Sequence, residues 1–177
     1  DAQRRLTEVK TPAPVAGAAR LSTTFKYDDA GNVTRVTDAR GKAVDYEYDG
    51  RGNRRLDRDA RGNTVVRTFD ERNQLVTETS FQTQDPDGAG GQPAGGPATT
   101  RFVYDGGSRL RFVVGAEGGV TEHRYGSSGA GEGLLTDLIV YTGGRYGVGE
   151  LAPSTALTED DLVPWVADQD EVQVERT

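Results

Sequence analysis

The chain of 177 residues contains no cysteine and few apolar side chains: 34% of its residues are hydrophobic and 7% are aromatic. The lack of thiols excludes a disulfide framework, a thiolate zinc site and a cysteine nucleophile. So low a fraction of hydrophobic residues argues against a large closed core. With 24 glycines and 7 prolines, the chain stays below the roughly 25–30% glycine plus proline of low-complexity sequences, so full disorder is also a poor description.

Long apolar runs and clustered positive charge are missing as well. No stretch approaches the roughly 18–20 apolar residues of a membrane-spanning helix, and no basic-then-apolar segment opens the chain. The net charge is −7, and residues 151–177 contribute −6 of it, because they carry seven acidic residues and one basic residue. The remaining residues are close to neutral. We therefore expect neither a nucleic-acid partner nor a membrane span.

What the sequence does contain is an internal repeat. Tyr27-Asp28, Tyr48-Asp49 and Phe69-Asp70 lie 21 residues apart, and Tyr104-Asp105 follows after 35 residues. The 14 extra residues correspond to the segment 85–98, in which glycine and proline fill eight positions. Tyr125 and Tyr146 resume the spacing of 21. A fixed period of 20–50 residues indicates a repeat architecture.

Each repeat holds two strand signals and two turn signals. Residues 44–48 alternate apolar and charged side chains, and residues 25–27, 65–69 and 102–104 keep an aromatic residue in the same parity, which predicts strands with one aromatic face. After the aromatic residue, aspartate opens a turn in which glycine supplies a positive φ, and residues 33–37 form the returning strand. Asp38–Gly41 and Asp59–Gly62 predict the second turn, and Gly118 stands at the matching offset after Tyr104.

These motifs resemble the Tyr-Asp (YD) or Rhs repeat of long bacterial secreted and cell-surface proteins and of animal teneurins. The residues that carry the resemblance are Tyr27, Asp28, Gly31, Asn32, Tyr48, Asp49, Gly52, Asn53, Phe69, Asp70, Tyr104, Asp105 and Tyr125. Residues 1–7 fit the same pattern, so we expect the array to continue before Asp1. The resemblance implies an all-β, antiparallel array of hairpins whose spiralling sheet forms part of a hollow shell, with a toxin domain enclosed in several family members.

The aromatic column has two interpretations. It can be a structural ladder, in which each repeat packs on the next, or a platform on which sugar rings stack. Phenylalanine at Phe69 favours packing over a role that needs the hydroxyl.

No set of residues predicts catalysis or a cofactor. His123 is the sole histidine; it shares the parity of Tyr125, which favours packing in the sheet over general-base catalysis, and no Gly-x-Ser-x-Gly motif accompanies it. Asp85-x-Asp87-Gly88 only faintly resembles a calcium loop, because the six to eight oxygen ligands of that ion are not provided. The glycine-rich segment 126–133 lacks the lysine of a phosphate loop and predicts a hairpin tip.

The last residues depart from the repeat. Thr158 followed by three acidic residues predicts a helix start, and Pro164 is expected to end the helix within about two turns. We therefore divide the chain into a YD/Rhs array over residues 1–150, with the glycine- and proline-rich insertion 85–98, and an acidic capping or inserted tail over residues 151–177. The tail is expected to cover an exposed sheet edge, or alternatively to dock a partner.

The function expected from these features is structural. The resemblance implies a segment of a large bacterial protein, secreted or at the cell surface, that encloses or displays a toxin or effector domain and contacts neighbouring repeats or that domain. The alternative is an extracellular module that binds carbohydrate or a cell-surface partner through the aromatic face or the insertion. In neither case do we expect an enzyme.

Overall fold

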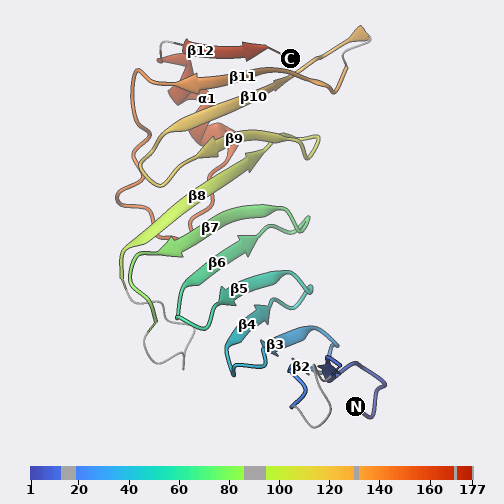
Figure 1. The fold of residues 1–177 in the computed structure, drawn as a ribbon. Helices are drawn as coiled ribbons and strands as arrows, with labels where there is room; N and C mark the ends of the chain where they lie inside the picture. The colour runs from blue at the N-terminus through green and yellow to red at the C-terminus, as the bar shows by residue number, and fades with distance from the viewer. Residues whose placement is uncertain (13–18, 86–94, 130–131, 170, 177) are drawn as a thin grey trace. The chain divides into compact units, whose positions relative to one another are not determined.

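The computed structural model describes residues 1–12, 19–85, 95–129, 132–169 and 171–176, with side chains described up to residue 169. The elements are β1 (Glu8–Lys10), β2 (Ser22–Tyr27), β3 (Val33–Thr37), β4 (Ala43–Tyr48), β5 (Arg54–Arg58), β6 (Thr64–Phe69), β7 (Leu75–Phe81), β8 (Pro97–Tyr104), β9 (Leu110–Val114), β10 (Val120–Tyr125), β11 (Leu135–Tyr141), α1 (Glu159–Ala167) and β12 (Glu171–Arg176) (Figure 1). The predicted all-β class with one short helix near the C-terminus is confirmed.

The chain forms two compact units. The first comprises Asp1–Val66 and Phe81–Gly96, and the second comprises Arg67–Ser80 and Pro97–Thr177. Within each unit, strands that follow one another in the sequence are neighbours in the sheet, and the pairings for which the register is known are antiparallel. The predicted strand segments around residues 25, 35, 46, 67 and 103 lie in β2, β3, β4, β6 and β8.

The hairpins from β2 to β7 and from β8 to β10 share one type of five-residue turn. In the turn Asp49–Asn53, the N–H of Gly52 donates to the carbonyl of Asp49 at 3.0 Å, and the N–H of Asp49 donates to the carbonyl of Asn53 at 2.9 Å. The fourth residue has a positive φ, which is 86° for Gly52. This is a three-residue hairpin loop with a left-handed residue at its end. We call the turns after an aromatic residue Tyr-Asp turns and the turns Asp38–Lys42, Asp59–Asn63 and Gly115–Gly119 return turns.

The Tyr-Asp turns differ from the return turns by a bulge. Tyr48 pairs with Arg54, whereas the preceding Glu47 pairs with Leu56, so Arg55 is an extra residue in the returning strand. The same shift occurs beside Tyr27, Tyr104 and Tyr125. A bulge at a fixed place in the repeat bends the returning strand in the same way each time.

The apolar core is small and lies in the second unit. Alternate residues of β8 to β11 are buried on one face of the sheet, together with Leu157 and Leu162 from the tail. The sheet residues of this cluster are Val103, Phe112, Val114, Val120, Ile139 and Tyr141. Phe102, His123 and Tyr125 belong to the opposite parity and are only half-buried. The predicted aromatic face is therefore not the tightly packed one.

The tail differs from the prediction in two respects. Pro164 lies inside α1, which continues to Ala167, because Leu162, Trp165 and Val166 pack against the core cluster and offset the hydrogen bond that proline removes. The helix packs on the buried face of the sheet. β12, a strand that the acidic sequence did not predict, belongs to the same tail and pairs along the edge of β11. The boundary at residue 150 remains a prediction.

Tyr146, which continues the spacing of 21, does not end a hairpin strand. β11 ends at Tyr141, and Tyr146 lies in the segment that leads to α1. Most of the insertion 85–98, including the Asp87-Gly88 part of the calcium-like motif, lies outside the described residues, as do residues 130–131 of the expected hairpin tip. No helix in the described part of the chain has the length and apolar character to cross a membrane.

Candidate functional site

The aspartate of each Tyr-Asp turn binds the turn that it opens. One carboxylate oxygen of Asp49 accepts hydrogen bonds from the backbone N–H groups of Arg51 and Asn53, both at 2.9 Å, and the other accepts from the Asn53 amide at 2.9 Å. These bonds favour the ionised carboxylate, with the Asn53 amide contributing most, and hold the pKa of Asp49 below its usual value. Asn32 and Asn63 lower the pKa of Asp28 and Asp59 in the same way.

The hydroxyl groups of the four motif tyrosines bind the backbone of the preceding repeat. Tyr48 donates to the carbonyl of Val33 at 3.0 Å, and Tyr125 donates to the carbonyl of Leu110 at 2.8 Å. Tyr104 donates to Leu75 at 3.0 Å. In every case the acceptor is the first residue after the preceding Tyr-Asp turn. We call this recurrent bond the tyrosine latch.

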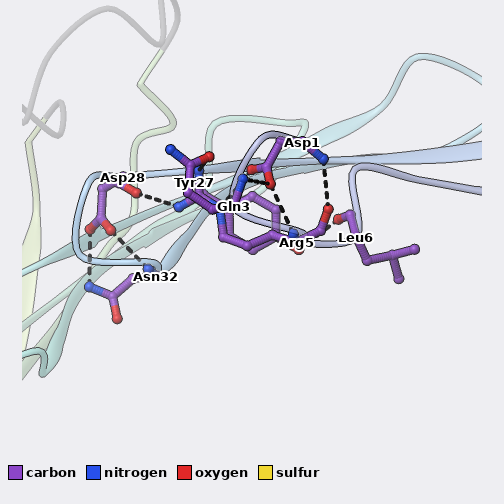
Figure 2. A network of polar contacts seen from close by, with 7 residues as sticks. All are labelled: Asp1, Gln3, Arg5, Leu6, Tyr27, Asp28 and Asn32. Atoms are coloured by element: carbon purple, nitrogen blue, oxygen red, sulfur yellow. Dashed lines mark hydrogen bonds and ion pairs between the residues drawn. The ribbon is translucent and has the colours of Figure 1, made fainter.

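The first repeat shows the complete arrangement (Figure 2). Arg5, the fifth residue of the turn that begins at Asp1, binds the Asp1 carboxylate at 2.7 Å and donates to the carbonyl of Asp28 at 2.8 Å. Its guanidinium carbon lies 4.6 Å from the centre of the Tyr27 ring, and Tyr27 donates to the carbonyl of Leu6 at 2.6 Å. The turn at Asp1 is therefore in phase with the array, as residues 1–7 predicted.

Arginine recurs in this role in the second unit. Arg109 occupies the fifth position of the turn at Asp105, binds the Asp105 carboxylate at 2.8 Å and lies 4.8 Å from the centre of the Tyr125 ring. A guanidinium at this distance from an aromatic face is a stabilising cation–π contact. The fifth turn residue thus binds the aspartate of its own turn and, when it is arginine, the tyrosine of the next repeat.

The predicted motif residues occupy equivalent places. Tyr27, Tyr48, Phe69, Tyr104 and Tyr125 each end a strand. Asp28, Asp49, Asp70 and Asp105 open the turns, Gly31 and Gly52 have positive φ, and Asn32 and Asn53 bind the aspartate. Where glycine is absent, Asn73, Ser108 and Arg4 take the positive φ. The ladder between repeats consists of hydrogen bonds, so the hydroxyl has a role that the presence of Phe69 did not suggest.

These contacts leave little for a chemical reaction. The hydroxyl, carboxylate and amide groups of the motif are occupied by one another and by backbone. Burial lowers the pKa of His123, a half-buried residue, which keeps its imidazole neutral near pH 7. The described residues hold no group of three or more histidine, aspartate or glutamate side chains placed to bind a metal ion. The hydrogen bonds of the site join the backbone of one repeat to that of the preceding repeat, which is a structural role.

Four charged residues among those described are buried, which the sequence did not predict: Arg58 and Asp85, which pair with each other, and Arg101 and Glu122. Arg101 is 2% exposed and donates to the carbonyls of Thr155 and Ala152, both at 3.0 Å, and burial lowers its pKa. Glu122 is 1% exposed and pairs with Arg111 at 2.6 Å and Arg124 at 2.9 Å. Both lie in the buried parity of their strands, which could have been recognised as the parity opposite to the aromatic residues.

The chain is thus a repeat protein of antiparallel β-hairpins, joined by Tyr-Asp turns that reach back to the repeat before. Residues 27–64 match the model of the family described as RHS Repeat, a range that holds two Tyr-Asp turns and two return turns. The match confirms the predicted resemblance to the YD/Rhs repeats for the part of the chain that it covers. No curated protein matches the sequence.

Proposed function

We propose that this RHS-repeat segment forms part of a β-sheet shell in a larger secreted or surface-exposed protein. That shell encloses or displays another domain of the same polypeptide. The tyrosine latch is the observation that supports this proposal best. Its hydroxyl groups bind backbone carbonyls at 2.6–3.0 Å, so they serve the cohesion of the sheet rather than a ligand.

The composition agrees with this role. Repeats that are fastened by hydrogen bonds to their neighbours need a smaller apolar core than a two-layer domain does. Among the residues whose burial is described, eight of the nine buried apolar residues belong to the cluster that includes Leu157 and Leu162 of the tail, and Leu56 is the one in the first unit. Most of the sheet is therefore held by strand pairing, turns and latches.

Protease protection in the parent polypeptide tests the enclosure. The sequence that adjoins the repeats should resist limited proteolysis while the repeats are folded and should become cleavable at the denaturant concentration that unfolds them. A double variant, Tyr48→Phe with Tyr104→Phe, should lower that concentration, whereas Tyr46→Phe, whose hydroxyl makes no hydrogen bond among the described residues, should not. Rapid cleavage of the adjoining sequence under native conditions would contradict an enclosing wall.

A glycan array on the 177-residue chain tests the competing role. The proposal predicts no saturable sugar binding. Binding that is lost in Tyr48→Ala, with the circular dichroism spectrum retained, would contradict a purely structural role. Fractionation of cells that produce the parent protein tests the proposed location, and recovery of the protein only from the cytosol would contradict it.

A further inference from the structure

Two segments of this chain leave the sheet through the same contact with a return turn. After β7, the N–H of Asp85 donates to the carbonyl of Gly62 at 3.0 Å, and after β11, the N–H of Tyr146 donates to the carbonyl of Gly118 at 2.8 Å. Both glycines have positive φ, 85° and 79°. We call the carbonyl oxygen and the open Cα side of such a glycine a glycine dock.

The docked segments lie so close that only glycine fits beneath them. A Cβ atom on Gly62 would be 2.4 Å from the carbonyl oxygen of Asp85, and a Cβ atom on Gly118 would be 2.1 Å from that of Tyr146. The docked residue therefore presents both its N–H and its carbonyl to the glycine. Because Asp85 and Tyr146 share only their backbone, the dock selects an extended backbone rather than a side chain.

The remaining return turn, Asp38–Lys42, has the same glycine dock at Gly41, but no segment of the described chain occupies it. Gly41 has a φ of 76°, and a Cβ atom placed on it would meet no atom within 4 Å. After the next two strands, β4 and β5, the chain continues directly into another return turn, so no segment of this repeat crosses over Gly41. Gly41 is an exposed residue and lines a cavity of about 510 Å³.

The charges around this cavity favour an acidic occupant. Two of its three acidic residues are neutralised within the chain, because Asp45 pairs with Arg35 at 3.0 Å and Asp85 pairs with Arg58 at 2.8 Å. The third, Asp59, accepts from the neutral amide of Asn63 at 2.7 Å and keeps its negative charge. Lys42 and Arg61 also line the cavity, and neither makes an ion pair within the described residues. The lining thus carries one positive charge in excess, from four basic and three acidic residues, beside a Gly41 carbonyl to which no described residue donates.

We propose that Gly41 is the docking point for an extended acidic peptide segment of a partner protein. Its backbone N–H donates to the Gly41 carbonyl, as the N–H groups of Asp85 and Tyr146 do at their docks, and its carboxylate is attracted by Lys42 and Arg61. Asp85, an acidic residue on an occupied dock beside the buried Arg58, is the model for this occupant. The proposal goes beyond the structural function and does not depend on it.

Amide chemical-shift titration of the full 177-residue chain tests the proposal. The probe is the peptide Phe-Gln-Thr-Gln-Asp with blocked ends, which copies residues 81–85. We expect saturable shifts at Gly41, Lys42 and Arg61, weaker binding at high salt, and an affinity at least several-fold lower for a peptide whose aspartate is replaced by asparagine. The variant Gly41→Ala should abolish the shifts.

The matched control is Gly52→Ala. Gly52 has a similar φ of 86° and equally open space, but it lies in a Tyr-Asp turn, so this variant should bind the peptide as the wild type does. The absence of saturable shifts, or equal affinity in Gly41→Ala, would overturn the proposal. Shifts centred on Gly62 would overturn it too, because the peptide would then be replacing the chain's own segment. Concentration-dependent shifts at Gly41 without peptide would instead identify a second copy of the chain as the occupant.

Discussion

At the scale of single residues, the tyrosine of the motif has two roles, one for its ring and one for its hydroxyl, and the aromatic spacing alone does not distinguish them. The ring ends a strand, and the hydroxyl reaches the carbonyl of the preceding repeat, as Tyr48 does with Val33. Phenylalanine can take the first role and not the second. The substitution at Phe69 therefore marks a repeat without a latch rather than a motif that never needed the hydroxyl.

Removing one latch should have a measurable cost. Tyr48→Phe deletes the bond to Val33 and leaves a half-buried carbonyl without that donor, so we expect the free energy of unfolding to fall by about 1 kcal/mol. Tyr46→Phe is the control, because the Tyr46 ring contacts Arg54 at 4.9 Å while its hydroxyl has no hydrogen-bond partner among the described residues. Urea denaturation measures both, and equal losses in the two variants would contradict the latch.

Two glycines with almost the same φ should respond differently to alanine. Gly52→Ala and Gly62→Ala both place a Cβ in the left-handed region, which costs about 1–2 kcal/mol. Only at Gly62 would the Cβ also meet Asp85 at 2.4 Å. We therefore expect Gly62→Ala to lower the thermal midpoint further than Gly52→Ala and to expose the segment after β7 to proteolysis. Similar midpoints would show that the close contact is not maintained in solution.

At the scale of the elements, the Tyr-Asp turn makes stability depend on acid. Hydrogen bonds from the turn lower the pKa of Asp28 and Asp49, whereas the unfolded chain titrates near the usual aspartate value of about 3.9. Stability from these groups is complete above that value and is lost as the pH falls through the lower pKa values of the folded chain. The urea midpoint should therefore decrease below about pH 4.

The variant Asp49→Asn should weaken that acid dependence. Its amide cannot ionise, so the slope of the urea midpoint against pH should become smaller below about pH 4. Asp29→Asn removes the same charge from the neighbouring turn, but the Asp29 carboxylate makes no hydrogen bond or ion pair among the described residues, and this control should keep the wild-type slope. An unchanged slope in Asp49→Asn would exclude this carboxylate as a source of acid sensitivity.

The segment before α1 depends on Arg101. Its guanidinium donates to backbone carbonyls of Ala152 and Thr155, so Arg101→Met should destabilise the second unit by about 2–3 kcal/mol and speed proteolysis between residues 151 and 158. The exposed Arg145, which forms no ion pair in the described chain, provides the control Arg145→Met with little expected change. Trp165, whose ring meets Tyr141 and Tyr146 edge-on at 6.0 Å, reports the loosening by fluorescence.

The elements that local sequence determines were predictable. β3 coincides with the predicted residues 33–37, and the turn positions follow from aspartate and glycine at fixed spacing. Contacts between repeats were not, because nothing in Tyr48 or Val33 alone shows that they meet. The continuation of α1 through Pro164 and the pairing of β12 also depend on partners distant in the sequence, which override local propensity.

At the scale of the whole molecule, the two units differ in how much apolar surface they bury. The cluster around Phe112, Val114 and Ile139 belongs to the second unit, and Leu56 is the buried apolar residue of the first among those described. Stability is expected to follow this difference, since local opening is easiest where few apolar contacts resist it. Hydrogen exchange should be slower in β9 to β11 than in β2 to β5, and uniform protection would contradict this expectation.

The tyrosine latch also favours one order in which the repeats fold. Every hydroxyl donates to a carbonyl that lies earlier in the sequence, at a separation of 15 residues for Tyr48 and Tyr125. A repeat that emerges during synthesis therefore finds its acceptor already made, and repeats can be completed one after another from the N-terminal end. If the repeats folded from the C-terminal end instead, each tyrosine would be placed before the strand that carries its acceptor carbonyl had folded.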